Sequence, residues 1–200
     1  MDKETQAGEL AATERRDQNT AFRTIGGWAL LANALLLLLV VLGSAVSGGG
    51  APLFLVASEV LGLLFLVGLP AIQALQPQTG RLGQAGLWCL GLAVGIALIV
   101  RMILLVSTVD VGDIVPFSSS LLALVGSLLV GWVTIQAKVF SPVFGWLLMV
   151  GGVLNFVSGL TPAGIGTTIV GIIAGLAQVG ALAGYGWTIV RSTRERPQAG

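Results

Sequence analysis

Six long apolar runs follow one another between Thr24 and Val190, and only short joints separate them. A helix rising 1.5 Å per residue needs roughly 20 residues to cross about 30 Å of hydrocarbon, and each run is about that long. The chain is 55% hydrophobic and 10% charged, with a mean hydropathy of +0.95. A soluble domain carries about 25% charged residues. The sequence therefore predicts an all-α fold, a bundle of six transmembrane helices.

The apolar runs define the domain organisation. The predicted spans are Gly27–Val46, Pro52–Leu75, Ala85–Ser107, Ser118–Gln136, Val143–Leu160 and Ile165–Val190. Together they form one transmembrane domain, residues 25–191, between an N-terminal tail, residues 1–24, and a C-terminal tail, residues 192–200. The N-terminal tail holds nine of the nineteen charges in the chain, mixed in sign. Such a composition predicts a solvated segment, with some helix around Gly8–Arg16.

A cleavable signal peptide is the alternative interpretation of the first span. Ala45-Val46-Ser47 follows an apolar run and has the small-residue pattern of a cleavage site. The segment before this run is long and slightly acidic, whereas a signal peptide begins with a short basic segment. The sequence therefore favours a retained first span.

The charges in the joints predict the orientation in the membrane. The second joint contains Arg81, the fourth joint contains Lys138, and the C-terminal tail contains Arg191, Arg194 and Arg196. The third joint instead contains the acidic residues Asp110 and Asp113. By the positive-inside rule, both termini lie in the cytoplasm. The five tryptophans, Trp28, Trp88, Trp132, Trp146 and Trp187, all lie toward the predicted cytoplasmic ends of their spans, as in an interfacial aromatic belt. We expect the chain in a bacterial cytoplasmic membrane.

Composition removes several classes of function. A net charge of +1 gives no strongly basic surface, so we expect no nucleic-acid partner. The chain has no histidine, which removes His-ligated haem, His-bearing zinc sites and His-activated nucleophiles. The single cysteine, Cys89, cannot form an internal disulfide or a redox pair, and no P-loop or nucleophile elbow occurs. We therefore predict no enzyme and no catalytic, cofactor-binding or metal-binding residues.

Glu59 and Arg101 are the only acidic or basic residues inside the spans. Counted along their helices, both lie about 10 Å below the outer surface, and Asn155 in the fifth span lies about 8 Å below it. Because charged groups are costly in hydrocarbon, such residues usually face a partner or a cavity. We predict an intramembrane polar cluster of Glu59, Arg101 and Asn155, with an ion pair between the first two. The alternatives are an unpaired Arg101 that reaches the headgroups, a protonated Glu59, and an ordinary interhelical hydrogen bond of Asn155.

Small residues recur at four-residue spacing in several spans. The sixth span has two such pairs on nearly opposite faces, Gly171 with Gly175 and Gly180 with Gly184, which predicts a helix packed closely on two sides. Beside lipids, the predicted partners of these surfaces are another membrane protein or a second copy of the chain. Packing within the bundle is the simpler use of the same surfaces.

The overall plan, including Leu-Pro-Ala-Ile-Gln-Ala at 69–74 and Gly-Arg-Leu-Gly-Gln-Ala-Gly at 80–86, resembles small multipass bacterial integral membrane proteins of unassigned function. This resemblance implies a polytopic fold and no site residues. We expect a structural or accessory role, and the alternative is a small transporter or channel that uses the outer-half polar cluster. If the cluster is structural, apolar residues such as Phe54 and Phe117 should cap it, and no polar path should continue below it.

Overall fold

The computed structural model describes residues 3–47, 52–75, 80–106, 114–161 and 164–195, and within these ranges it contains helices and no strand. The helices are α1 (Lys3–Ser47), α2 (Pro52–Leu75), α3 (Gly80–Val106), α4 (Ile114–Ala137), α5 (Pro142–Leu160) and α6 (Ile165–Arg194). Each contains a segment that is long and apolar enough to cross a membrane. The prediction of an all-α bundle with six transmembrane helices is confirmed.

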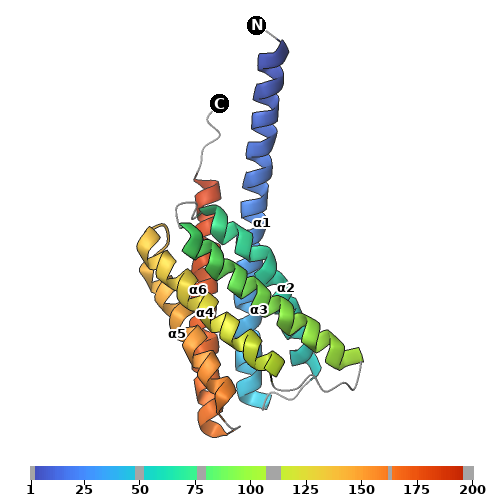
Figure 1. Cartoon of the computed structure of the whole chain (residues 1–200), viewed down its shortest axis with the longest axis vertical. Coiled ribbons are helices and arrows are strands. Elements are labelled where there is room, and N and C mark those ends of the chain that lie inside the picture. The colour runs from blue at the N-terminus through green and yellow to red at the C-terminus, as the bar shows by residue number, and fades with distance from the viewer. Residues whose placement is uncertain (1–2, 48–51, 76–79, 107–113, 162–163, 196–200) are drawn as a thin grey trace.

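The first helix is longer than the sequence predicts. α1 runs without a break from Lys3 to Ser47, through the tail where the sequence predicts some helix around Gly8–Arg16. The expected helix is present and longer, because hydropathy marks only the part of a helix that lies in lipid, whereas Ala, Glu and Arg favour helix in water too. The apolar span begins at Thr20, so at 1.5 Å per residue the preceding part of α1 extends about 25 Å beyond it. Figure 1 shows this part of α1 projecting from the bundle at the end where both termini lie.

The six helices pack in the order of the chain. Each contacts the next, and α6 returns to pack extensively against α1, so the set closes on itself. The contact between α2 and α3 is the least extensive of these neighbouring pairs. We call the end that carries both termini the terminal end, and the opposite end the distal end (Figure 1).

Glycines allow the closest approaches between helices. A Cβ added to Gly131 of α4 would lie 2.6 Å from the backbone oxygen of Gly145 on α5. Gly186 of α6 lies against α1 in the same way, with the oxygen of Gly27 at 2.8 Å. On α6, Gly175 meets Val41 of α1 while Gly184 meets Phe144 of α5. The predicted two-sided packing of the sixth span is therefore present.

The hydrophobic core lies mainly in the terminal half of the bundle. All six helices contribute side chains to it, among them Leu30, Ile72, Leu90, Val130, Leu148 and Tyr185. Leu30 and Tyr185 are completely buried, so α1 is part of this core and its removal would expose the facing sides of α2 and α6.

The outer surface of the bundle is apolar. On α5, exposed large side chains recur at alternating spacings of four and three residues: Trp146, Val150, Val153, Val157 and Leu160. Residues at this spacing lie along one face of a helix. An exposed apolar face on every helix is the surface that lipid chains would cover.

Candidate intramembrane polar site

Glu59 of α2 and Arg101 of α3 lie close together, as the sequence interpretation proposes. The Nη1 atom of Arg101 is 3.8 Å from the Oε1 atom of Glu59. This distance is within ion-pair range but longer than the roughly 2.7–2.9 Å of a charge-assisted hydrogen bond. Nearby, a Cβ added to Gly62 would lie 2.9 Å from Leu98 Cδ2, so a glycine lets α2 approach α3 one turn below Glu59.

The two partners differ in exposure. The Glu59 side chain is 19% exposed and the Arg101 side chain 45% exposed. The arginine is therefore the open side of the pair, and the carboxylate is the shielded side. Ion pairing and exposure of Arg101 thus occur together, whereas the sequence interpretation treated them as alternatives.

Asn155 does not join this pair. α5, which carries Asn155, packs against α4 and α6, and among the described residues no Cα atom of α5 lies within 8 Å of one in α2 or α3. The three residues share a similar depth, but α4 separates α3 from α5 in the closed order of helices. The predicted three-residue cluster is therefore wrong, because equal depth does not make two helices neighbours.

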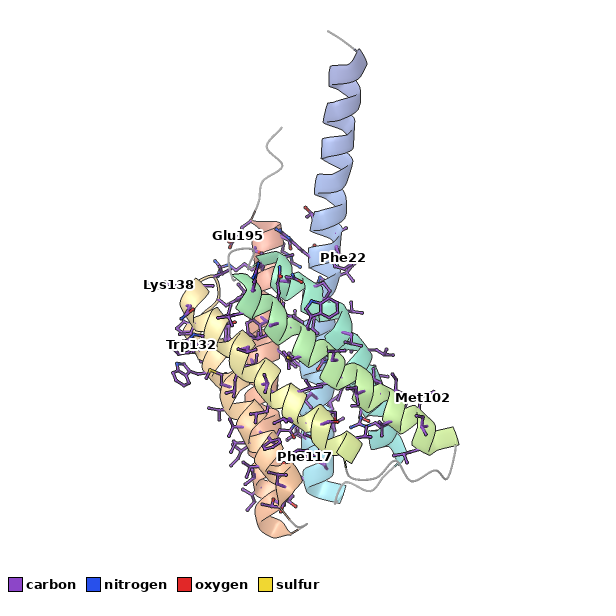
Figure 2. All side chains as sticks on the ribbon, in the orientation of Figure 1. Phe22, Met102, Phe117, Trp132, Lys138 and Glu195 are labelled. Carbon is purple, nitrogen blue, oxygen red and sulfur yellow. The ribbon has the colours of Figure 1, made fainter. Side chains whose placement is uncertain are left out.

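Phe117 also has a different role from the expected one. Its ring lies 6.0 Å from that of Phe156, centroid to centroid, and so links α4 to α5. Figure 2 shows Phe117 toward the distal end of the bundle. The side chain of Phe54, the other expected cap, lies outside the described residues.

Two buried polar contacts between helices were not anticipated. Asn33 of α1 is 3% exposed and donates from Nδ2 to the backbone oxygen of Leu61 on α2, at 2.5 Å. Tyr185 of α6 donates its hydroxyl to Thr134 Oγ1 on α4, at 2.9 Å, and both residues are completely buried. The edge of the Tyr185 ring meets Phe140, with the centroids 4.9 Å apart. Asn33 could have been found from sequence, since it is the one amide in the first predicted span.

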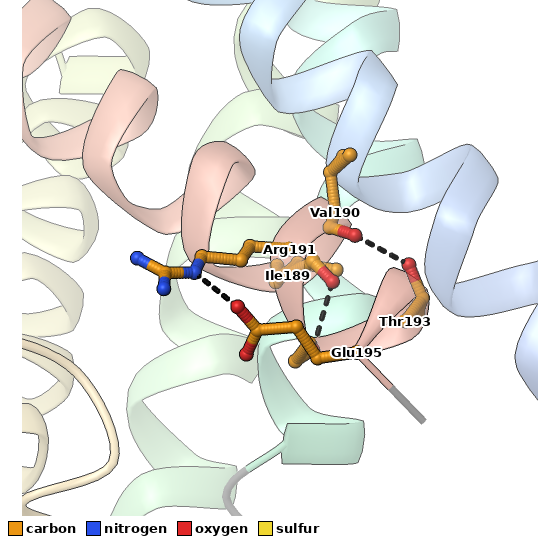
Figure 3. A network of polar contacts seen from close by, with 6 residues as sticks. Ile189, Val190, Arg191, Thr193 and Glu195 are labelled. Atoms are coloured by element: carbon orange, nitrogen blue, oxygen red, sulfur yellow. Dashed lines mark hydrogen bonds and ion pairs between the residues drawn. The ribbon is translucent and has the colours of Figure 1, made fainter. Parts of the chain in front are cut away.

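Basic residues gather at the terminal end. Arg23 Nη2 donates to the backbone oxygen of Ala74, at 2.9 Å, and thus caps the last turn of α2. A cation there also complements the negative end of the helix dipole. Arg191 pairs with Glu195 along α6, with Nε and Oε1 2.5 Å apart (Figure 3). Lys138 and Glu195 lie toward this end, and Met102 lies toward the distal end (Figure 2).

The tryptophans, like the basic residues, lie toward the terminal end of the bundle. All five are exposed: Trp28, Trp88, Trp132, Trp146 and Trp187. Each lies within nine residues of the terminal end of its helix or apolar span. Tryptophan at this level is typical of a membrane–water interface.

Comparison with protein-family models, with curated proteins and with solved structures finds no match. Within the described residues, no group of three or more Cys, Asp or Glu side chains lies close enough to hold a metal ion. The decisive observation is that six membrane-spanning helices pack around one core. The chain is a multi-pass integral membrane protein.

Proposed function

We propose that this protein is a structural or accessory component of a membrane, without catalytic activity of its own. The observation that carries the proposal is the closely packed terminal half of the bundle. Leu30, Tyr185 and Ile189 are completely buried there, and Val130 is 2% exposed. Such a core offers no route for an ion, because a conducting path needs polar groups or water along its length.

The polar side chains of the spans support the same role. Asn33 and Tyr185 are used in contacts between helices. Among the described side chains, Arg23 Nε is the only buried nitrogen or oxygen atom without a hydrogen-bond partner. Polar groups satisfied inside a bundle fix how its helices pack and leave few donors or acceptors for a substrate.

We further propose that the terminal end faces the cytoplasm of a bacterial cell, with both termini inside. The exposed basic residues Arg81, Lys138 and Arg191 lie at this end. The exposed tryptophans, which lie toward the same end, support a membrane–water interface there. The partners of the protein are then membrane lipids and another membrane protein or a second copy, which would meet the apolar outer surface.

The alternative is a small transporter. It is favoured by the ion pair of Glu59 and Arg101, because a charged pair inside a span is a common mark of a substrate or ion pathway. A transporter would have to open the terminal half during its cycle.

Flux through proteoliposomes separates the two functions. We expect purified protein to give no more ion or solute movement than protein-free liposomes. Glu195, a carboxylate exposed at the end of α6, provides the matched control for Glu59. Flux that is lost in Glu59→Gln and kept in Glu195→Gln, with both variants folded, would overturn the structural role in favour of transport.

A further inference from the structure

The inward side of α5 is open in the distal half of the bundle. Asn155 follows Gly151 and Gly152 by one turn and shares their face of the helix. Both glycines pack tightly: an added Cβ would lie 2.9 Å from Gln178 Cγ on α6 at Gly151, and 2.6 Å from Ser127 Cβ on α4 at Gly152. Asn155 nevertheless is exposed.

This exposure is not explained by the lipid-facing surface. Val153 and Val157 belong to the exposed apolar stripe of α5, and each lies two residues from Asn155. At 100° per residue, Asn155 is about 160° away from both of them around the helix axis. Its amide therefore points to the inside of the bundle, and the space that exposes it lies there too.

Two glycines mark the same open space. Gly159 follows Asn155 by four residues, and a Cβ added to it would meet nothing within 4 Å. On α6, Gly171 precedes Gly175 by four residues, and its added Cβ also meets nothing within 4 Å, although Gly175 lies against Val41. Open space thus adjoins α5 at Gly159 and α6 at Gly171, although the hydroxyl oxygens of Thr161 and Thr167 lie 3.4 Å apart and link the two helices at the distal end.

The end of α3 gives no second sign of this space. Ala93, Ala97 and Arg101 succeed one another at four-residue spacing, on the side of α3 away from the exposed Ile99. Ala93 is 3% exposed, Ala97 is half-buried and Arg101 is exposed. The next three residues, Met102, Ile103 and Leu104, are exposed as well, so the end of α3 is exposed on every side and the exposure of Arg101 marks no inward space.

We propose that the distal half of the bundle encloses a water-filled vestibule, with Asn155 on its wall. The vestibule opens at the distal end and is closed by the core of the terminal half. Water is the occupant because lipid chains in this space would leave the Asn155 amide without hydrogen bonds, whereas water solvates it. Small hydrophilic solutes enter as far as the core. The proposal goes beyond the structural role and does not depend on it.

Thiol labelling in membrane vesicles tests this vestibule. In a Cys89→Ala background, single cysteines replace three inward residues, Asn155, Gly159 and Gly171, and three lipid-facing residues at matched depth, Val153, Val157 and Ile169. A membrane-impermeant maleimide reacts with the thiolate, which forms in water and not in hydrocarbon, so the inward set should react at least roughly tenfold faster than the matched set. The fast reaction should require reagent on the distal side of the membrane.

Two results would overturn the proposal. Equal, slow reaction of both sets means that lipid or a partner helix fills the space. Fast reaction from the terminal side means that the core does not close it. The glycine positions keep the test valid if Asn155→Cys fails to fold, because an added Cβ meets open space at Gly159 and Gly171.

Discussion

Arg101 Nη1 lies 3.8 Å from Glu59 Oε1 across the contact between α2 and α3, the least extensive contact between sequential helices. The ion pair therefore joins the two helices where few other contacts do so. Because Arg101 is 45% exposed and the distance is too long for a strong hydrogen bond, the pair contributes less than a fully buried one.

A double-mutant cycle measures this contribution. We expect the unfolding costs of the single variants Glu59→Gln and Arg101→Leu, added together, to exceed the cost of the double variant. The difference, which is the coupling energy, should be about 0.5 to 1 kcal/mol. The measurement is the free energy of unfolding in mixed micelles. Arg191 and Glu195, an exposed pair at the C-terminal end of α6, should show a smaller coupling. Additive costs for Glu59 and Arg101 would contradict the pairing.

Tyr185→Phe should destabilise the bundle. The change removes the hydroxyl that donates to Thr134 Oγ1 in the core, and a hydrogen bond of this kind contributes about 0.5 to 1.5 kcal/mol. Thermal unfolding monitored by circular dichroism provides the measurement. Thr193→Val is the control, because the Thr193 hydroxyl bonds to the backbone of its own helix, at Val190. An unchanged midpoint in Tyr185→Phe would show that the contact contributes nothing.

Glycine-to-alanine changes should separate the two halves of the bundle. Gly131→Ala and Gly145→Ala place a methyl group against the backbone of the facing helix and should cost about 1 to 3 kcal/mol. Gly159→Ala and Gly171→Ala meet open space and should be neutral or stabilise by up to about 1 kcal/mol, since alanine favours helix. Unfolding free energies of the four variants test this contrast. Equal costs in both pairs would refute it.

The orientation predicts which joints react with reagents outside the cell. Cysteines at Gly48, Gly112 and Ala163 should label from outside, and those at Thr79 and Val139 should not. Four of these positions lie outside the described residues, and Val139, in the short joint after α4, is exposed. The reverse pattern of labelling would place the termini outside.

The spans were predictable because hydrophobicity along the chain reports directly on length in lipid. The bounds of α2 agree with the sequence prediction, and the bounds of α5 differ by one residue. The start of α1 was not predictable in this way, since its first residues gain no stability from lipid. Helix propensity alone predicts only a short helix in this segment.

Prediction of the candidate site succeeded for one pair and failed for the third residue. Glu59 and Arg101 lie on sequential helices, which usually pack together, and their depths agree. Asn155 has the right depth on a helix that is not a neighbour, and depth contains no information about the order of helices around the bundle. The buried contact of Tyr185 with Thr134 was equally hidden, because tyrosine and threonine are common in spans that make no such bond.

The unbroken helix from Lys3 to Ser47 has a mechanical consequence. Its backbone hydrogen bonds join the segment before the span directly to Gly27, which lies against Ile189 and Val190 of α6. A force applied by a protein bound to the projecting turns would therefore reach the contact between α1 and α6 directly, because no irregular backbone separates the two.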